Sequence, residues 1–598
     1  MKKLAFLISI LFVLSLSIQA FSMPQVIKPT GDKYNIIDNF IKHMTIEEKI
    51  GQMLMPSIRY TDGTHVGEVS GTPVTQMVPE LKNMIQKYHL GGVILFAQNV
   101  QTTEQTTKLT NDIQKASLKI PMFISIDQEG GLVYRLQEGT QLPGNMAIGA
   151  TGSTDLAYKN GQVVGSEIKA VGINWNLAPV ADVNVNPANP VIGIRSFGAD
   201  SDLVSKMTIA YMKGEQSEGV AACLKHFPGH GDVAIDSHLG LGVVNKDRDT
   251  LDKVELKPFK DAIAAGADAI MTAHLSFPAL DDTKVTMKAP DGTVEEITIP
   301  ATLSHKILTD LLRNEFGFNG VIITDAMNMK AISDNFGPID ATVRAIKAGA
   351  DIVLMPMDLD GAYNELIKEV KDGTIPESRI DESVKRILTL KLKRGIMKFP
   401  EENVEESINN AKSIVGSERN LSIEKETAQK AITLIRNDNS ILPIKDPDSS
   451  KKILVIAGTQ FRTTTYLSQI QKYHPQNNDS LIVSDSTLNS NKDLSDQEKS
   501  AIDKADIIIV ATNNMTNQDN QIIKMLDYGK GKTFIFIAVR NPYDLMYYPN
   551  VDAYLAQYGW NTCNLNAAID VIFGAINPSG KLPVAIPGLY DIGYGLSY

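Results

Sequence analysis

The chain has 598 residues, with 58 basic and 69 acidic side chains and a formal net charge of −11. Hydrophobic residues make up 43% and charged residues 21%, which excludes a disordered chain, a collagen and a multi-span membrane protein. The length favours roughly two to four domains. The negative charge argues against binding to nucleic acid, but it leaves open a neutral sugar or a small anion in a local basic pocket.

The N-terminus has the pattern of an export signal. Lys2 and Lys3 precede an apolar stretch over 4–16, and small residues follow it. This order predicts a signal peptide over residues 1–22, with cleavage after Ser22 or else after Ala20. We therefore expect a protein that works outside the cytoplasm, either secreted or associated with the cell wall. The alternative is an uncleaved N-terminal membrane anchor, although a stretch of about 17 residues is marginal for a span. No other apolar run is long enough for a membrane span, so we expect none in the mature protein.

Short apolar runs alternate with amphipathic segments between residues 30 and 400. The eight runs are 50–55, 92–96, 122–126, 173–178, 220–224, 269–272, 321–324 and 352–355. Continuous apolar runs separated by helices are typical of parallel strands that are buried on both faces. Eight such units predict a (β/α)8 TIM-type barrel over residues 30–400. The phrase Ala-Gly-Ala-Asp at 265–268 and again at 348–351 supports repeated units, because each indicates a helix that ends at a glycine.

The rest of the chain predicts further elements around and after this barrel. Residues 281–302, with Asp291-Gly292 between β-prone runs, predict a hairpin inserted after the sixth strand. The basic run 385–394 is expected to form one solvated face of an amphipathic helix. A helical linker is expected over 401–430. A second alternation then predicts a smaller α/β sandwich domain with a largely parallel sheet over 431–598.

Polar residues follow five of the predicted barrel strands. In such barrels the active site lies at the carboxyl ends of the strands, so these residues are expected to converge on one face. In chain order they are Asp127-Gln128-Glu129, Asp182, Lys225-His226, His274 and Asp325.

The densest polar cluster spans residues 226–238. It contains His226, His230, Asp232, Asp236 and His238. Histidine and aspartate are metal ligands, so the cluster is compatible with a metal site. It is equally compatible with acid/base chemistry, in which an aspartate orients and charges a histidine. A loop held by hydrogen bonds is a third interpretation, and the spacing alone does not decide among them.

Asp325 follows the apolar run 321–324 directly. A carboxylate at the mouth of a barrel, partly shielded from water, suits a nucleophile that stabilises positive charge on a sugar carbon. The alternative is a helix N-cap, because aspartate is a favoured capping residue and residues 326–329 can begin a helix.

Several of these phrases together resemble glycoside hydrolase family 3. They are Lys225–Asp232, Asp236–His238, Asp127–Gly131 and Gly320–Met327, and the likeness extends over 189–197 and the second domain. More narrowly, they are similar to the β-N-acetylglucosaminidase branch of cell-wall turnover. The resemblance implies a retaining exo-β-N-acetylglucosaminidase that removes terminal N-acetylglucosamine from peptidoglycan fragments (muropeptides), without cofactor or metal.

The resemblance also implies roles for individual residues. Asp325 matches the catalytic nucleophile, and Asp236 with His238 matches an Asp-His general acid/base dyad. The residues that match binding positions for the N-acetylglucosamine unit are Asp127, Arg135, Arg195, Lys225 and His226. Two other functions stay open: a metal-dependent barrel hydrolase that uses the histidine and aspartate cluster, and a β-N-acetylglucosaminide phosphorylase. The intact Asp325, Asp236 and His238 argue against a non-catalytic wall-binding protein.

Overall fold

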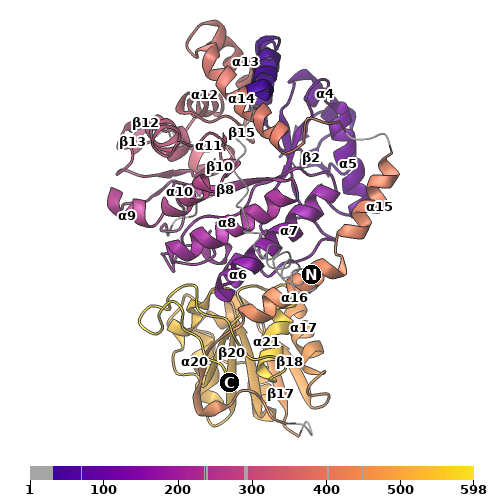
Figure 1. Ribbon diagram of the computed structural model, residues 1–598. Coiled ribbons are helices and arrows are strands. Elements are labelled where there is room, and N and C mark those ends of the chain that lie inside the picture. Colours follow the sequence, from indigo (N-terminus) through magenta and orange to yellow (C-terminus); the bar gives the residue numbers. More distant parts are fainter. Residues whose placement is uncertain are drawn as a thin grey trace, which may run out of the picture. The chain divides into compact units, whose positions relative to one another are not determined.

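The computed structural model describes residues 31–68, 70–234, 236, 240–288, 294–399, 403–446 and 450–598 (Figure 1). The predicted signal peptide and the predicted Asp291-Gly292 turn lie outside the described residues. The chain divides into a short unit that ends at Met44 and contains helix α2 (Gly31–Lys42), and a second unit, Thr45–Tyr598. Among the described helices, none is long and apolar enough to cross a bilayer.

Eight parallel strands in the described part of the second unit form a barrel. They are β1 (Leu54–Met55), β5 (Gly92–Leu95), β6 (Phe123–Ile126), β7 (Trp175–Asn176), β8 (Ala221–Phe227), β10 (Ala269–Thr272), β14 (Val321–Ile323) and β15 (Val353–Leu354). Neighbouring strands pair in parallel. Two parallel bridges, Ser57 with Ile94 and Ile323 with Ile352, close the ring. Each predicted apolar run therefore supplies one strand, and the predicted (β/α)8 barrel is confirmed.

Helices surround the strands in Figure 1. They include α3 (Ile46–Gln52), α4 (Pro79–Lys87), α5 (Thr103–Ala116), α7 (Thr154–Ala170), α8 (Ser201–Ser217), α9 (Arg248–Lys253), α10 (Lys257–Ala264), the π-helix η3 (Lys306–Glu315), α12 (Pro338–Ala348), α13 (Leu359–Lys371) and α14 (Glu377–Lys393). Helix α12 ends where the sequence predicts. Gly349 follows it with φ +127°, a conformation that side chains rarely adopt. The inserted hairpin is also confirmed, as antiparallel strands β12 (Lys284–Lys288) and β13 (Val294–Thr298).

The basic run 385–394 is not the single solvated face that we expected. Lys391 is fully buried, and burial lowers its pKa to about 7. Lys393 and Arg394 bind the buried carboxylate of Asp268, with Nζ–Oδ1 and Nε–Oδ2 distances of 2.8 and 2.7 Å. Asp268 directly precedes β10, and a carboxylate buried at that position requires a cationic partner. The expectation was wrong because the helix supplies those partners.

Two helices lead from the barrel to a second α/β domain, α15 (Val404–Ile414) and α16 (Glu418–Ala431). The sheet of this domain has the order β16-β21-β20-β19-β17-β18. Its strands are β16 (Thr433–Asn437), β17 (Ile453–Ala457), β18 (Asn478–Ile482), β19 (Ile507–Thr512), β20 (Thr533–Ala538) and β21 (Ala553–Ala556). Only β16 pairs antiparallel in this sheet of the described chain. The predicted α/β sandwich with a largely parallel sheet is therefore confirmed.

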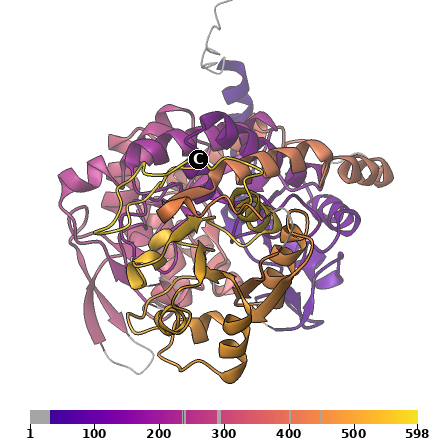
Figure 2. The same cartoon turned by 90° about the horizontal axis from the view of Figure 1, so that it is seen from below.

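Helices cover both faces of this second sheet. They are α17 (Gln460–Ile470), α19 (Asp496–Lys504), α20 (Gln521–Tyr528) and α21 (Thr562–Ile572). Figure 2 views the molecule from the side of this domain, with its orange and yellow elements in front. One apolar cluster on the sheet includes Met146, Ala147 and Ile194 of the barrel domain as well as Tyr543 and Tyr558. The two domains therefore share part of one hydrophobic core.

Asp544 makes the stability of this second domain depend on pH. It lies in the 3-10 helix η5 (Pro542–Tyr547), is 1% exposed, and accepts a hydrogen bond from the Met515 N–H at 2.7 Å. Burial raises its pKa from 3.8 to about 7. As pH rises through that window, the unfolded chain loses the proton before the folded one does, so the free energy of unfolding falls.

We expect Asp544→Asn to remove this decline. Above pH 7 the variant should exceed wild type by at most about 4 kcal/mol in free energy of unfolding, since each pKa unit corresponds to about 1.4 kcal/mol. Denaturant unfolding between pH 4 and pH 8 measures the effect, with Asp527→Asn on the exposed part of α20 as a control. If the free energy of unfolding depended on pH in the same way in wild type and Asp544→Asn, Asp544 would not be the source of the decline.

Candidate active site

A cavity of about 380 Å³ lies at the carboxyl ends of the barrel strands, within the size range of small-molecule sites. Of the eight predicted site residues, six line it: Asp127, Arg135, Arg195, Lys225, His226 and Asp325. These residues come from strand ends and loops that are far apart in sequence. The convergence that we expected from the strand ends is therefore present in the structure.

A buried ionic cluster forms the floor of this cavity. The Lys225 Nζ donates to Asp127 Oδ1 at 2.6 Å and contacts Glu129 Oε1 at 2.7 Å. The Arg195 guanidinium binds Glu129 through two bonds, from Nε at 2.9 Å and from Nη2 at 2.8 Å. Burial alone would raise the pKa of Glu129, but Arg195 and Lys225 outweigh it and keep that pKa well below its ordinary value. These charge-assisted, partly bidentate contacts hold Asp127 and Lys225 in fixed positions at the cavity.

Asp182 fixes the two histidines at the end of β8. It is fully buried, and its Oδ2 lies 2.8 Å from His226 Nδ1. Its Oδ1 accepts the backbone N–H groups of His226 and His230, at 3.0 and 2.7 Å. A carboxylate partner at Nδ1 sets the tautomer and orientation of the His226 ring. Burial and the neighbouring His226 lower the pKa of His230 to about 4.

Asp325 presents a carboxylate at the end of β14. Its Oδ1 accepts the Ala326 N–H at 2.7 Å, and no side chain in the described part of the chain donates to it. His274 lies 3.0 Å from the Ala326 carbonyl oxygen through Nε2, and so holds the turn that follows Asp325. Burial alone would raise the pKa of Asp325, but His226 and His274 outweigh it and keep that pKa below 3.8. Asp325 is therefore ionised at neutral pH.

The helix N-cap alternative for Asp325 is wrong. The next helix, α11 (Lys330–Ser333), begins five residues later and has Met329 in the capping position. The carboxylate of Asp325 instead lines the cavity. This position leaves it available for chemistry.

The predicted acid/base loop is only partly within the described residues. Asp236 is half-buried, whereas His238 lies outside the described residues. Asp232 pairs with Lys246 at 3.3 Å. Within the described ranges, which do not include His238, no group of three or more histidine, cysteine or acidic side chains is arranged to hold a metal ion.

Sequence reasoning gave no specific role to several residues that build the site. Glu129 and Asp182 stood among the strand-end acids, but only the structure shows which cations they hold. Arg59 lines the cavity from an insertion after β1, with its guanidinium 3.6 Å from the centre of the Phe96 ring. No strand-end pattern marks an insertion of this kind. His274, another strand-end residue, holds the turn after Asp325 through the Ala326 carbonyl oxygen and is not among the residues that line the cavity.

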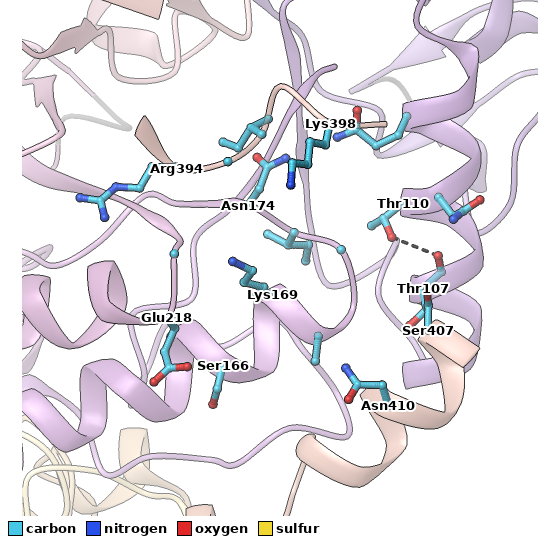
Figure 3. A pocket seen from close by; sticks show the side chains of 18 of the residues that line it. Thr107, Thr110, Ser166, Lys169, Asn174, Glu218, Arg394, Lys398, Ser407 and Asn410 are labelled. Atoms are coloured by element: carbon cyan, nitrogen blue, oxygen red, sulfur yellow. Dashed lines mark hydrogen bonds between the residues drawn. The ribbon is translucent and has the colours of Figure 1, made fainter. Parts of the chain in front are cut away.

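A larger cavity of about 600 Å³ lies at the opposite, amino-terminal end of the barrel strands, between α5, α7 and α15 (Figure 3). Lys169 and Lys398 extend into it in Figure 3. Several of its polar groups serve the backbone: Thr110 donates to the Val171 carbonyl at 2.6 Å, and Asn174 donates to that of Met122 at 3.0 Å. Because catalysis in such barrels occurs at the carboxyl ends of the strands, we place the reaction in the smaller cavity.

The fold and site define a two-domain barrel enzyme with an ionised carboxylate at the mouth of its barrel. Comparison with protein families agrees with this class. Residues 45–390 match the glycosyl hydrolase family 3 N terminal domain, and residues 432–598 match the glycosyl hydrolase family 3 C-terminal domain. The chain belongs to glycoside hydrolase family 3 and is a glycoside hydrolase.

Similar proteins share the same two-domain extent. β-Hexosaminidase A of Pseudoalteromonas piscicida is 35% identical over 602 residues, which cover 91% of this chain and 97% of that protein. A β-N-acetylglucosaminidase/β-glucosidase of Cellulomonas fimi is 26% identical, covering 92% and 96%. The solved family 3 β-N-acetylglucosaminidase of Paenibacillus sp. str. FPU-7 has a TM-score of 0.77 and 32% identity, covering 91% and 99%.

Proposed function

We propose that this protein is a retaining exo-β-N-acetylglucosaminidase that removes non-reducing terminal N-acetylglucosamine from peptidoglycan fragments (muropeptides) outside the cytoplasmic membrane. The observation that carries this proposal is the ionised carboxylate of Asp325, which lines the cavity together with Asp127, Lys225, Glu129 and Arg195. The names of the relatives support the sugar specificity. The N-terminal export pattern supports the location.

The proposed chemistry begins with attack by Asp325. Breaking a glycosidic bond builds positive charge at the anomeric carbon and negative charge on the departing oxygen. An ionised carboxylate stabilises the positive charge at the anomeric carbon and forms a covalent glycosyl–aspartate. Hydrolysis of that intermediate then gives net retention of configuration. The low pKa of Asp325 suits this step, because only the ionised form attacks.

The second charge requires a proton donor. We assign this role to His238 with Asp236 as its partner, on the strength of the family phrase Asp236-Ser237-His238. A carboxylate beside an imidazole favours the charged ring, so the histidine can protonate the departing oxygen at neutral pH. The same ring, once neutral, removes a proton from the water that attacks the glycosyl–aspartate.

The ionic floor supplies binding groups for the sugar. Lys225, Arg195 and Arg135 offer donors, and Asp127 offers an acceptor, so hydroxyl groups meet complementary partners. His226 stands beside them with its ring oriented by Asp182. In this proposal these side chains bind the sugar and the Asp-His pair transfers the proton, so both tasks are carried out by groups of the chain itself.

One assay tests the proposal and its alternatives. We expect hydrolysis of an aryl β-N-acetylglucosaminide at least about tenfold faster, by kcat/KM, than that of the matching β-glucoside, a ratio that corresponds to about 1.4 kcal/mol. A chelator should not change the rate. Loss of activity on chelation would favour the metal-dependent hydrolase. Release of a sugar 1-phosphate in phosphate buffer would favour the phosphorylase, and preference for the glucoside would contradict the sugar assignment.

A further inference from the structure

The C-terminal domain contacts the barrel segment that carries Arg195. This segment, residues 184–199, contains the 3-10 helix η1 (Gly193–Arg195). At its end the Ala199 N–H donates to the Pro583 carbonyl at 2.9 Å. At its start the Asn184 Nδ2 donates to the Tyr543 hydroxyl at 3.2 Å. The C-terminal domain therefore holds the segment at both ends.

A short hydrogen-bond chain links Tyr543 to Arg195. Asn184 is 1% exposed, and its Oδ1 accepts the Gly193 N–H at 3.1 Å. The two ends of an amide side chain differ, so the hydroxyl that accepts from Nδ2 also keeps Oδ1 directed at Gly193. Gly193 begins η1, and Arg195 ends it. Arg195 then makes its two bonds to Glu129 in the floor of the cavity.

Asn541 of the C-terminal domain packs against the same turn. A Cβ added to Gly193 would lie 3.0 Å from Asn541 Oδ1, so the amide packs directly on the glycine. Gly193 has φ +45°, in the left-handed region that favours glycine. Asn541 is buried and its backbone N–H donates to Asn514 Oδ1 at 3.2 Å, which fixes its own position. The contact therefore limits movement of η1 toward the C-terminal domain.

We propose that Tyr543 and Asn541 are positioning residues that hold Arg195 where it binds Glu129 and, in the proposed reaction, the sugar. Among the described residues that line the catalytic cavity, none belongs to the C-terminal domain. The domain thus acts on substrate binding through the 184–199 segment rather than by direct contact. The effect on the sugar rests on the proposed function, whereas the effect on the position of Arg195 does not.

The first test separates binding from turnover. We expect Tyr543→Phe to raise KM for an aryl β-N-acetylglucosaminide about three- to tenfold, the factor that loss of one hydrogen bond typically costs. The kcat should change less, because Tyr543 contacts no reacting atom. Tyr547→Phe is the matched control, since it lies in the same helix η5 and its hydroxyl makes no hydrogen bond within the described residues. Equal KM values for wild type and Tyr543→Phe would overturn the proposal.

The second test asks whether the effect passes through Arg195. In an Arg195→Lys background, which loses the bidentate contact with Glu129, adding Tyr543→Phe should change kcat/KM little further. A coupled pair gives such a non-additive result, whereas independent residues multiply their fold-changes. Full multiplication of the two effects would show that Tyr543 does not act through Arg195, and would overturn the proposal.

The third test needs no substrate. Amide hydrogen exchange of a peptide spanning 184–199 should be about three- to tenfold faster in Tyr543→Phe than in wild type, and unchanged in Tyr547→Phe. If wild type failed to cleave the N-acetylglucosaminide, the proposed function would be wrong. The exchange measurement would still test the positioning role, because it needs no substrate. Unchanged exchange in Tyr543→Phe would overturn that role whatever the activity.

Discussion

Asp325→Asn should lower kcat for an aryl β-N-acetylglucosaminide by roughly 10⁴-fold or more, the scale seen when a catalytic nucleophile is removed. The amide has nearly the shape of the carboxylate, and its Oδ1 can still accept the Ala326 N–H. It can neither attack the anomeric carbon nor balance the positive charge there. Substrate binding should survive, since the ionic floor is untouched. Pre-steady-state kinetics and a binding measurement together test both parts.

Asp351→Asn provides a contrast for this prediction. Asp351 is another buried aspartate of the barrel, which accepts a hydrogen bond from the Ser383 hydroxyl at 2.6 Å and pairs with Arg386 at 3.1 Å. Its variant should lose stability, because it breaks a buried ion pair, while the folded fraction keeps most of its kcat. If the kcat of Asp325→Asn were also within about tenfold of the wild-type kcat, the assignment of Asp325 as the nucleophile would be wrong.

His238→Ala should show a loss that depends on the leaving group. A natural sugar alcohol leaves poorly without a proton, so its cleavage should be almost abolished. An activated nitrophenol needs little help, so its first step should survive much better. The glycosyl–aspartate should then accumulate, because the proposed mechanism uses the same ring to activate the attacking water. Azide, an external nucleophile, should restore turnover of the nitrophenyl substrate.

Asp236→Ala should give a weaker version of the same pattern. In the proposed dyad, loss of the Asp236 carboxylate should lower the pKa of the His238 imidazole toward its reference value of about 6.5, so the alkaline limb of the rate profile should move to lower pH. A metal site gives different results. His238→Ala would then lose activity on both substrates alike, and azide would not restore turnover. Added zinc would restore the activity of wild-type protein that had been treated with a chelator.

The barrel was predictable because its strands are continuous apolar runs. Strand β10 (Ala269–Thr272) coincides with its run, and Gly266 and Gly349 end helices where the repeated phrase indicates. The site was predictable only as far as strand ends converge in a parallel barrel. That rule brought Asp127, Lys225 and Asp325 together without any knowledge of their contacts.

The remaining features depend on contacts between distant segments. Glu129 becomes part of the site through Arg195, 66 residues away, and no local pattern encodes that pair. The basic run 385–394 was misjudged for the same reason, since Asp268 is its partner across the fold. The link from Tyr543 to Asn184 spans 359 residues and two domains, so only the folded chain shows it.

Covalent trapping tests the central claim most directly. A fluorinated N-acetylglucosamine analogue with an activated leaving group should slow hydrolysis of the glycosyl–enzyme, and peptide mass spectrometry should then find one added sugar on the peptide that contains Asp325. With an ordinary aryl β-N-acetylglucosaminide, which is turned over, NMR should show the sugar released first as the retained β-anomer. Label on another carboxylate such as Asp127 or Glu129, or an inverted product, would contradict the account.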